Sequence, residues 1–293
     1  GGNSLNLFRT SSADSAVGLF ANRNHQAALM ALNLPLVAAL ATARLRDGGA
    51  RRERVMATGA GVITLLLIAI AASGSRMGLV LGAVGLVAAV SIYLSCAGRT
   101  PFDAPRRPAL WAAGAAAALA AIVPIALLIA RSGVVERLAS RDAIEQTRVA
   151  ALSPMLAAAQ AFMPFGAGFG TFEPVYQRFE PDALLSTIYL NHAHNEPVQL
   201  AIEGGVAALA LLALFLLWWV RASIRAVRPR DSAPRRAMGI AAASGTLILM
   251  LSSLVDYPLR TPLLGGLFAL MCVELARATH MPPRAPRQIV EPA

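Results

Sequence analysis

The stretch Ile188-Tyr-Leu-Asn-His-Ala-His-Asn-Glu-Pro-Val-Gln-Leu200 closes a long polar segment and leads directly into an apolar block. It holds two of the four histidines of the chain, His192 and His194, with asparagine on both sides. The block that follows, residues 198–220, carries a single charged residue, Glu203. Polar side chains that gather where an apolar helix begins point to a functional site at a membrane surface.

The composition indicates a membrane protein. Of the 293 residues, 56% are hydrophobic and only 14% are charged, and the apolar residues come in blocks of roughly the 20 residues that a helix needs to cross about 30 Å of hydrocarbon. The expected fold class is therefore all-α, a polytopic helical membrane protein with about seven transmembrane helices. The predicted spans are residues 26–43, 55–73, 77–97, 109–130, 198–220, 237–255 and 261–278.

The arginines assign the sides of the membrane. The formal charge is +10, every basic residue is Arg, and these residues gather in three short loops: 44–54, 98–108 and 221–236. By the positive-inside rule all three loops are cytoplasmic, so the N-terminus lies outside and the C-terminus inside. This charge therefore serves orientation, and we expect no nucleic-acid partner.

The segment 131–197 faces the other side and is far longer than a helix hairpin needs, which favours a functional role. Residues 141–161 have the composition of a helix, with Ser140 as its N-cap and a kink at Pro154. Glycines at alternate positions of the stretch 166–170 predict a turn. We expect an extracytoplasmic helical subdomain in this loop.

The remaining features have structural readings. Gly74, Gly78 and Gly82 form a ridge of small residues that predicts close helix packing. Cys96 and Cys272 lie inside apolar runs, so neither a disulfide framework nor a metal-ligand spacing is present.

The two ends of the chain carry expectations of their own. The chain begins without an initiator Met or a charged leader, so we expect further helices upstream. We expect one membrane domain over residues 1–280, followed by a Pro-rich disordered tail at 281–293.

The histidine stretch offers a base and a helix start. Either His192 or His194 can accept a proton from a sugar hydroxyl near neutral pH, because an unperturbed imidazole has a pKa of about 6.5. A surface histidine without function is the alternative. Asn195 suits the N-cap of the following helix and Glu196 suits its first turn, so both are predicted to support the site.

Three arginines on the outer side suit an anionic group. Arg76 lies in a short turn between apolar helices, Arg148 lies in the long outer segment, and Arg260 follows the last outer turn. The planar guanidinium binds phosphate with two hydrogen bonds, so these residues are candidates for a diphosphate site. Snorkelling or a salt bridge is the alternative for each, and an Asp256–Arg260 pair is the simpler reading of the last turn. Glu203 is read either as an interhelical hydrogen-bond partner or as a substrate contact.

The ordered set of these pieces resembles the O-antigen ligase and O-antigen polymerase family of bacterial surface-polysaccharide enzymes. The resembling pieces are Gly18-Leu-Phe-Ala-Asn-Arg-Asn24, Ser73-Gly-Ser-Arg-Met-Gly78, Arg148, Phe165-Gly-Ala-Gly-Phe-Gly-Thr-Phe172, His192-Ala-His-Asn195, Gln199-Leu-Ala-Ile-Glu-Gly-Gly205 and Ser253-Leu-Val-Asp-Tyr-Pro-Leu-Arg260. They follow the family order from about residue 18 to 260, as its C-terminal portion.

The resemblance implies a GT-C-like fold in the bacterial inner membrane with a periplasmic catalytic loop. It implies transfer of a glycan from an undecaprenyl-diphosphate carrier to an acceptor hydroxyl, on the lipid A core in a ligase of lipopolysaccharide biosynthesis or on another glycan chain in a polymerase. Arginines at the positions of Arg76 and Arg148 are thought to hold the diphosphate, and His194, or alternatively His192, acts near the acceptor.

The residues themselves make this chemistry coherent. Arginines and a helix N-terminus can balance the charge of a diphosphate leaving group, so we expect no cofactor and no metal. Direct displacement at the anomeric carbon then makes an inverting glycosyltransferase. The competing class is a transporter of lipid-linked glycans, which usually places ionisable groups near the membrane midplane instead of at the rim.

Overall fold

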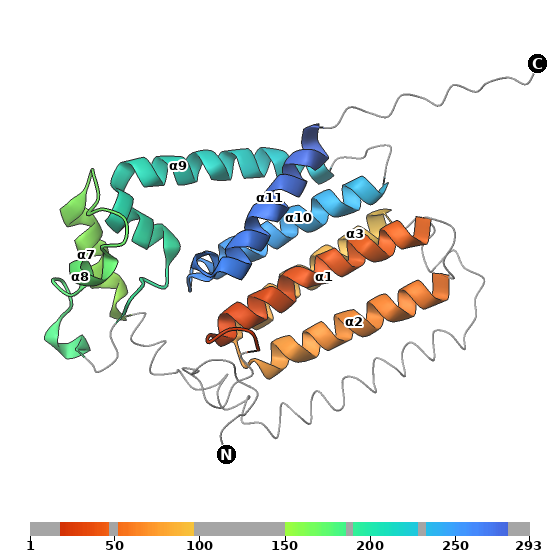
Figure 1. The fold of residues 1–293 in the computed structure, drawn as a ribbon, viewed down its shortest axis with the longest axis horizontal. Coiled ribbons are helices and arrows are strands. Elements are labelled where there is room, and N and C mark those ends of the chain that lie inside the picture. The colour runs from red at the N-terminus through yellow and green to blue at the C-terminus, as the bar shows by residue number, and fades with distance from the viewer. Residues whose placement is uncertain (1–17, 47–51, 97–149, 186–189, 228–232, 281–293) are drawn as a thin grey trace, which may run out of the picture.

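The structure is a computed structural model that describes residues 18–46, 52–96, 150–185, 190–227 and 233–280. All regular elements in these ranges are helices, which confirms the all-α prediction. Six of these helices are long. Figure 1 shows the short helices α7 (Leu152–Phe162) and α8 (Phe172–Tyr176) beyond one end of them. The long helices are α1 (Arg23–Arg46), α2 (Arg52–Ala72), α3 (Arg76–Cys96), α9 (Glu196–Val227), α10 (Ala233–Ser252) and α11 (Pro262–His280).

These helices match six of the seven predicted spans. The remaining predicted span, 109–130, lies outside the described residues, and so does the tail at 281–293. Five of the six, namely α1, α2, α3, α9 and α11, are long and apolar enough to cross a membrane. The chain is therefore a polytopic helical membrane protein.

Helix α10 is long enough to span a membrane but is not among those five, and its packing explains why. It begins with Ala233-Pro-Arg-Arg236, and half of the residues that follow are Ala, Gly or Ser. It packs against α1, α3, α9 and α11, so most of its surface faces protein. Small residues permit close approach between helices, and a helix covered by its neighbours does not need the hydropathy of one that faces lipid.

Gly78 and Gly82 of the predicted ridge lie in α3 and pack against neighbouring helices as predicted, whereas Gly74 lies in the turn before α3. A Cβ at Gly78 would lie 2.5 Å from the Ala27 Cβ of α1, and one at Gly82 would lie 3.2 Å from Ile70 of α2. The central apolar cluster takes buried residues from all six long helices, among them Leu81 of α3 and Ile70 of α2.

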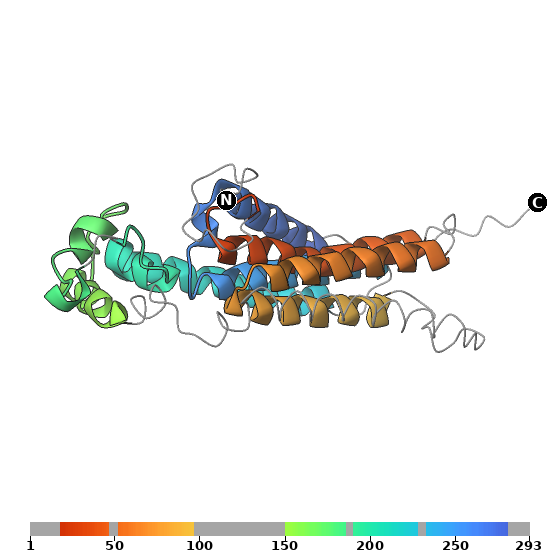
Figure 2. The same ribbon diagram turned by 90° about the horizontal axis from the view of Figure 1, so that it is seen from below.

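The segment that contains α7 and α8 forms a separate small core. Helices α7 (Leu152–Phe162) and α8 (Phe172–Tyr176) pack against the first turns of α9, where Phe172 and Tyr176 stack with their ring centroids 5.6 Å apart. The turn at Ala151 precedes α7, so the predicted helix is interrupted on the N-terminal side of Pro154, which has no N–H to continue it. The part of that prediction at 140–149 lies outside the described residues. Figure 2 also places α7 and α8 at this end of the long helices.

Helix α9 bends sharply at Gly205, where φ is 54° and ψ is −145°. The bend exposes backbone groups of α9 to the loop of residues 163–170, hereafter the glycine loop. Ala167 N–H donates to the carbonyl of Ile202 at 2.8 Å, and Val206 N–H donates to that of Pro164 at 2.8 Å. The predicted turn at 166–170 is confirmed, and its role is to fill the bend of α9.

We expect Gly205→Ala to lower the free energy of unfolding by about 1–3 kcal/mol, because few L residues adopt this conformation and the added Cβ would meet the Pro164 carbonyl. Unfolding followed by circular dichroism during detergent titration measures the change. Gly266→Ala in α11 is the control, since nothing lies within 4 Å of a Cβ there. Equal midpoints for the two variants would contradict this explanation of the bend.

Candidate active site

The candidate site lies at the end of the bundle where α1, α3 and α9 begin. Hydrogen bonds join the starts of α1 and α9 to the turn that follows α10, and the start of α3 to that of α1, over sequence separations of 51 to 234 residues. The site therefore exists only in the folded bundle, and it collects the N-terminal, positive ends of three long helices.

Asp256, in the turn after α10, is the centre of the site and is fully buried. Its Oδ2 accepts hydrogen bonds from the side-chain amides of Asn22 and Asn24, each at 2.8 Å. Its Oδ1 lies 3.0 Å from His194 Nδ1 and accepts the Tyr257 N–H at 3.0 Å. Both oxygens of the Asp256 carboxylate thus interact with groups of the protein.

The neighbouring bonds fix which way the two amides point. Asn22 Oδ1 accepts the Asn24 N–H at 2.8 Å, and Asn24 Oδ1 accepts the Ser75 hydroxyl at 2.7 Å. Each amide nitrogen must therefore face Asp256. Ser75 Oγ also accepts the Gly78 N–H at 2.9 Å, which caps α3. An array of donors around both oxygens fits the ionised carboxylate, since a protonated acid would place a hydrogen against another donor.

The local backbone aims His194 at this carboxylate. His194 has a φ of 48°, an uncommon left-handed conformation for a residue other than glycine. Asn195 follows, and its Oδ1 accepts the Val198 N–H at 3.1 Å, which confirms the predicted cap of α9. With Nδ1–H donating to Asp256, the lone pair of the His194 ring lies on Nε2, so this nitrogen is the basic one.

A second histidine lies near the same carboxylate. His25, in the first turn of α1, is buried, and its Nε2 lies 3.5 Å from Asp256 Oδ1. Tyr257 lies among three imidazoles, with ring centroids 5.2, 4.6 and 4.8 Å from those of His25, His192 and His194. The ring of Tyr257 thus fills the space between the histidines.

His192 has a different environment from His194. Gln199 Nε2 lies 3.4 Å from His192 Nδ1, and Gln199 Oε1 accepts the Ala193 N–H at 3.0 Å, which turns the amide nitrogen toward the ring. Nδ1 then accepts, and the ring proton lies on Nε2. Burial lowers the pKa of His192 below 6.5, and the nearby Arg260 guanidinium lowers it further.

The lowered pKa of His192 predicts a pH dependence of stability. The unfolded chain binds this proton at a higher pH than the folded chain, so the contribution to stability is complete above 6.5 and is lost as the pH falls through the folded pKa. We expect His192→Asn to flatten the decline of the unfolding midpoint below pH 6.5. A decline that is unchanged in His192→Asn would contradict the assignment.

Arg260 does not pair with Asp256, which corrects the simpler reading of the last turn. Its Nε and Nη2 donate to the two oxygens of Glu196 at 2.8 and 3.0 Å, and Nη2 lies 3.8 Å from Glu203 Oε2. The reason is geometric. Arg260 lies in the short 3-10 helix Pro258–Arg260 and faces the first turns of α9, whereas the donors around Asp256 already occupy that carboxylate.

Glu203 ties the glycine loop to α9. It is 1% exposed, and its Oε1 accepts the N–H groups of Gly170 and Phe172 and the Gln199 amide, each at 3.2 Å. A continuous polar chain therefore runs from Arg260 through Glu203 and Gln199 to His192. Of the two readings of Glu203, its contacts match the interhelical hydrogen bond, because Phe172 is the first residue of α8, while Gly170 lies in the glycine loop and Gln199 in α9 itself.

Of the two arginines predicted to bind a diphosphate with Arg260, only Arg76 lies within the described residues. Arg76 is the first residue of α3, next to Ser75, and is partly exposed at the same end of the bundle. Arg148 lies outside the described residues. In the described part of the chain, no group of three or more His, Cys, Asp or Glu side chains could hold a metal ion, and metal-free chemistry stays a prediction.

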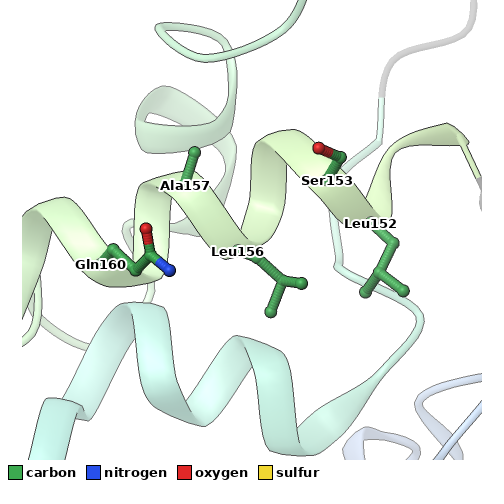
Figure 3. Close-up of a pocket in the computed structure, with 5 residues that line it drawn as sticks. All are labelled: Leu152, Ser153, Leu156, Ala157 and Gln160. Atoms are coloured by element: carbon green, nitrogen blue, oxygen red, sulfur yellow. The ribbon is translucent and has the colours of Figure 1, made fainter.

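An open cavity of about 470 Å³ lies elsewhere, on one face of α7. Figure 3 shows its five lining residues, Leu152, Ser153, Leu156, Ala157 and Gln160, all from that helix. None of the predicted site residues lines it. The cavity is shallow and carries no titratable group, so the polar cluster around Asp256 remains the stronger candidate site.

Reasoning from the sequence missed the groups that surround Asp256. Asn22, Asn24 and Ser75 belonged to recognised pieces of sequence but received no role, and His25 was not singled out. A cluster of Asn and His at the start of an apolar helix, Asn22-Arg-Asn-His25, is the signal that could have identified them.

The helices and this polar cluster at one end of them define a polytopic membrane protein with a site at the rim of its bundle. A family model described as O-Antigen ligase matches residues 61–213, more than half of the 293-residue chain. The chain belongs to this family, which implies a glycosyltransferase-like enzyme of the O-antigen ligase or polymerase type. The matched range contains Arg76, His192 and His194, whereas Asp256 lies beyond it. No curated protein and no solved structure matches the chain.

Proposed function

We propose that the chain transfers a glycan from an undecaprenyl-diphosphate carrier to an acceptor hydroxyl at the periplasmic face of the bacterial inner membrane. The observation that carries the proposal is the 3.0 Å contact between His194 Nδ1 and the buried Asp256 carboxylate, within a family of O-antigen ligases. A histidine oriented by a carboxylate is an arrangement suited to removing a proton from a hydroxyl.

His194 is the better base of the two histidines. Asp256 stabilises the imidazolium that forms when His194 Nε2 takes the acceptor proton. In His192 the Gln199 amide occupies the acceptor nitrogen, and the lowered pKa opposes protonation. His192 therefore serves as a hydrogen-bond donor toward the acceptor.

The acceptor oxygen then attacks the anomeric carbon and displaces the lipid diphosphate, which inverts the configuration at that carbon. The bond between the anomeric carbon and the phosphate oxygen breaks, and its electron pair leaves with the diphosphate. The acceptor proton remains on His194. The step needs no oxidant and no reductant, and the charge to be balanced is that of the leaving group.

Arg76 and Arg148 are proposed to bind that diphosphate. Arg76 lies at the N-terminus of α3, where the helix dipole also favours an anion, and the starts of α1 and α9 lie at the same end of the bundle. Arg260 is a weaker candidate than the sequence indicated, because Glu196 and Glu203 already balance its charge. Its proposed role is to hold α9 and the last turn in register around the histidines, with Glu196, Glu203 and Asn195 as the supporting residues.

We expect Arg76→Ala to lower kcat/KM for the lipid-linked donor by about 10–100-fold, the size of one or two hydrogen bonds to a charged group. Arg76→Lys should recover part of the loss, since it keeps the charge but not the planar fork. Arg221→Ala, at the opposite end of α9, is the matched control. If Arg76→Ala behaves like this control, Arg76 does not bind the donor.

Reconstitution of the purified chain with an undecaprenyl-diphosphate oligosaccharide and a set of defined acceptors tests the function. A new glycosidic bond, detected by mass spectrometry, is expected, and the acceptor that is used distinguishes a lipid A core ligase from a chain polymerase. Movement of the donor across the bilayer without bond formation would instead show a transporter.

A further inference from the structure

Two phenylalanines of the glycine loop are unusually exposed. Phe165 is 89% and Phe169 is 71% exposed, although each is a large apolar side chain. They lie four positions apart on the same loop, next to the bend of α9. Large apolar groups that a protein leaves uncovered together mark a surface that contacts a partner or a membrane.

The loop that carries them is held in place by the bend of α9. Its hydrogen bonds to Ile202 and Val206 fix its backbone, and a Cβ at Gly205 would meet the backbone of Phe165. The ring of Phe169 lies over Gly204, because a Cβ at that position would be 2.9 Å from the ring. The exposed side chains are therefore presented from a fixed backbone.

The length of α9 places this loop relative to the membrane. Beyond the bend, the uncharged run from Val206 to Val220 covers about 22 Å at about 1.5 Å per residue. Arg221 follows it and shares a cavity with Thr279 near the end of α11, so Arg221 marks the opposite membrane boundary. A hydrocarbon layer of about 30 Å measured from Arg221 extends past Gly204 and reaches the glycine loop.

Exposed apolar side chains also occur along α9 beyond the bend. Val206, Leu211 and Leu214 are exposed, and α9 is long and apolar enough to span a membrane. Figure 1 shows α7 and α8 beside the bent end of α9. We propose that Phe165 and Phe169 insert into the membrane leaflet on this side and anchor the α7–α8 segment to the bilayer.

The proposed membrane anchor does not depend on the proposed reaction. It does have a consequence for the candidate site. Glu203 accepts hydrogen bonds from Gly170 of the glycine loop and from Phe172 at the start of α8. It also accepts one from Gln199, whose amide lies beside His192. A loop held at the membrane surface therefore holds the polar chain behind His192 at a defined depth. A lipid-linked donor would enter the site at that depth.

Tryptophan quenching by brominated lipid tests the insertion. The variants F165W and F169W, made in the full chain, are placed in nanodiscs of phosphatidylcholine with or without bromine near the top of the acyl chains. The emission of the parent chain is subtracted, because it contains other tryptophans. Q177W, an exposed polar position at the end of α8, is the matched control for a residue in water, and L211W is the control for a residue in lipid.

The expected result is loss of the added emission at positions 165 and 169, comparable to the loss in L211W, with little loss in Q177W. Emission that behaves like that of Q177W would overturn the proposal. So would blue-shifted emission that brominated lipid does not quench, which would indicate that a protein covers the two side chains. F165W and F169W probe the same loop independently. If one variant fails to fold, the quenching of the other still tests the insertion.

Discussion

Replacing His194 by Ala is expected to lower the rate of glycan transfer by about 10²–10⁴-fold, the usual contribution of a positioned general base. The variant removes the imidazole that faces Asp256 but leaves the Asn195 cap and the start of α9 in place. The donor should still bind, so the loss should fall on kcat and not on the KM for the donor. Single-turnover transfer in proteoliposomes measures the step.

His192→Ala is the matched control for this prediction. It removes a second imidazole from the same turn, but one whose acceptor nitrogen faces Gln199 and whose pKa is lowered. We expect a smaller loss than in His194→Ala. Full activity in both variants would exclude a histidine base, and a larger loss in His192→Ala would exchange the two roles.

Asp256 substitutions are expected to affect both activity and stability. Asp256→Ala removes the acceptor of two asparagine amides, a backbone N–H and His194 from a fully buried position, and breaking a buried charged network by removing one partner costs about 3–5 kcal/mol. We therefore expect both loss of transfer and a marked fall in the unfolding midpoint.

Asp256→Asn separates these two effects. It keeps the shape and one acceptor oxygen, so it should destabilise the fold less than Asp256→Ala. It also loses the negative charge that stabilises the imidazolium, so we expect the loss of transfer to approach that of His194→Ala. Asp182→Asn, at an exposed position outside the site, is the control for a lost carboxylate. A fully active Asp256→Asn would show that the carboxylate serves only the fold.

The sequence predicted the helices well because the hydropathy of a lipid-facing helix is a local property. It did not predict that α10 is largely surrounded by protein, because the contacts of α10 with four neighbouring helices cannot be inferred from its own residues. The cap at Asn195 and the turn at residues 166–170 were also predictable, because both depend on the chemistry of a few adjacent positions.

The centre of the site was harder to predict, for the opposite reason. Asp256 and Arg260 lie one helical turn apart in the sequence, which suggested a pair, but Arg260 faces Glu196 while Asp256 faces the start of α1. The asparagines that hold Asp256 are 234 and 232 positions away. Only the packing of α1 against α10 brings these residues together, and no local pattern encodes it.

The most direct test of the account is a double-mutant cycle between His194 and Asp256. Single-turnover rates are measured for the parent, His194→Ala, Asp256→Asn and the double variant, with unfolding midpoints to confirm that each is folded. If His194 and Asp256 act as one unit, the double variant loses no more activity than His194→Ala alone. Losses that multiply would show that the two residues act independently, and this would contradict the proposed mechanism.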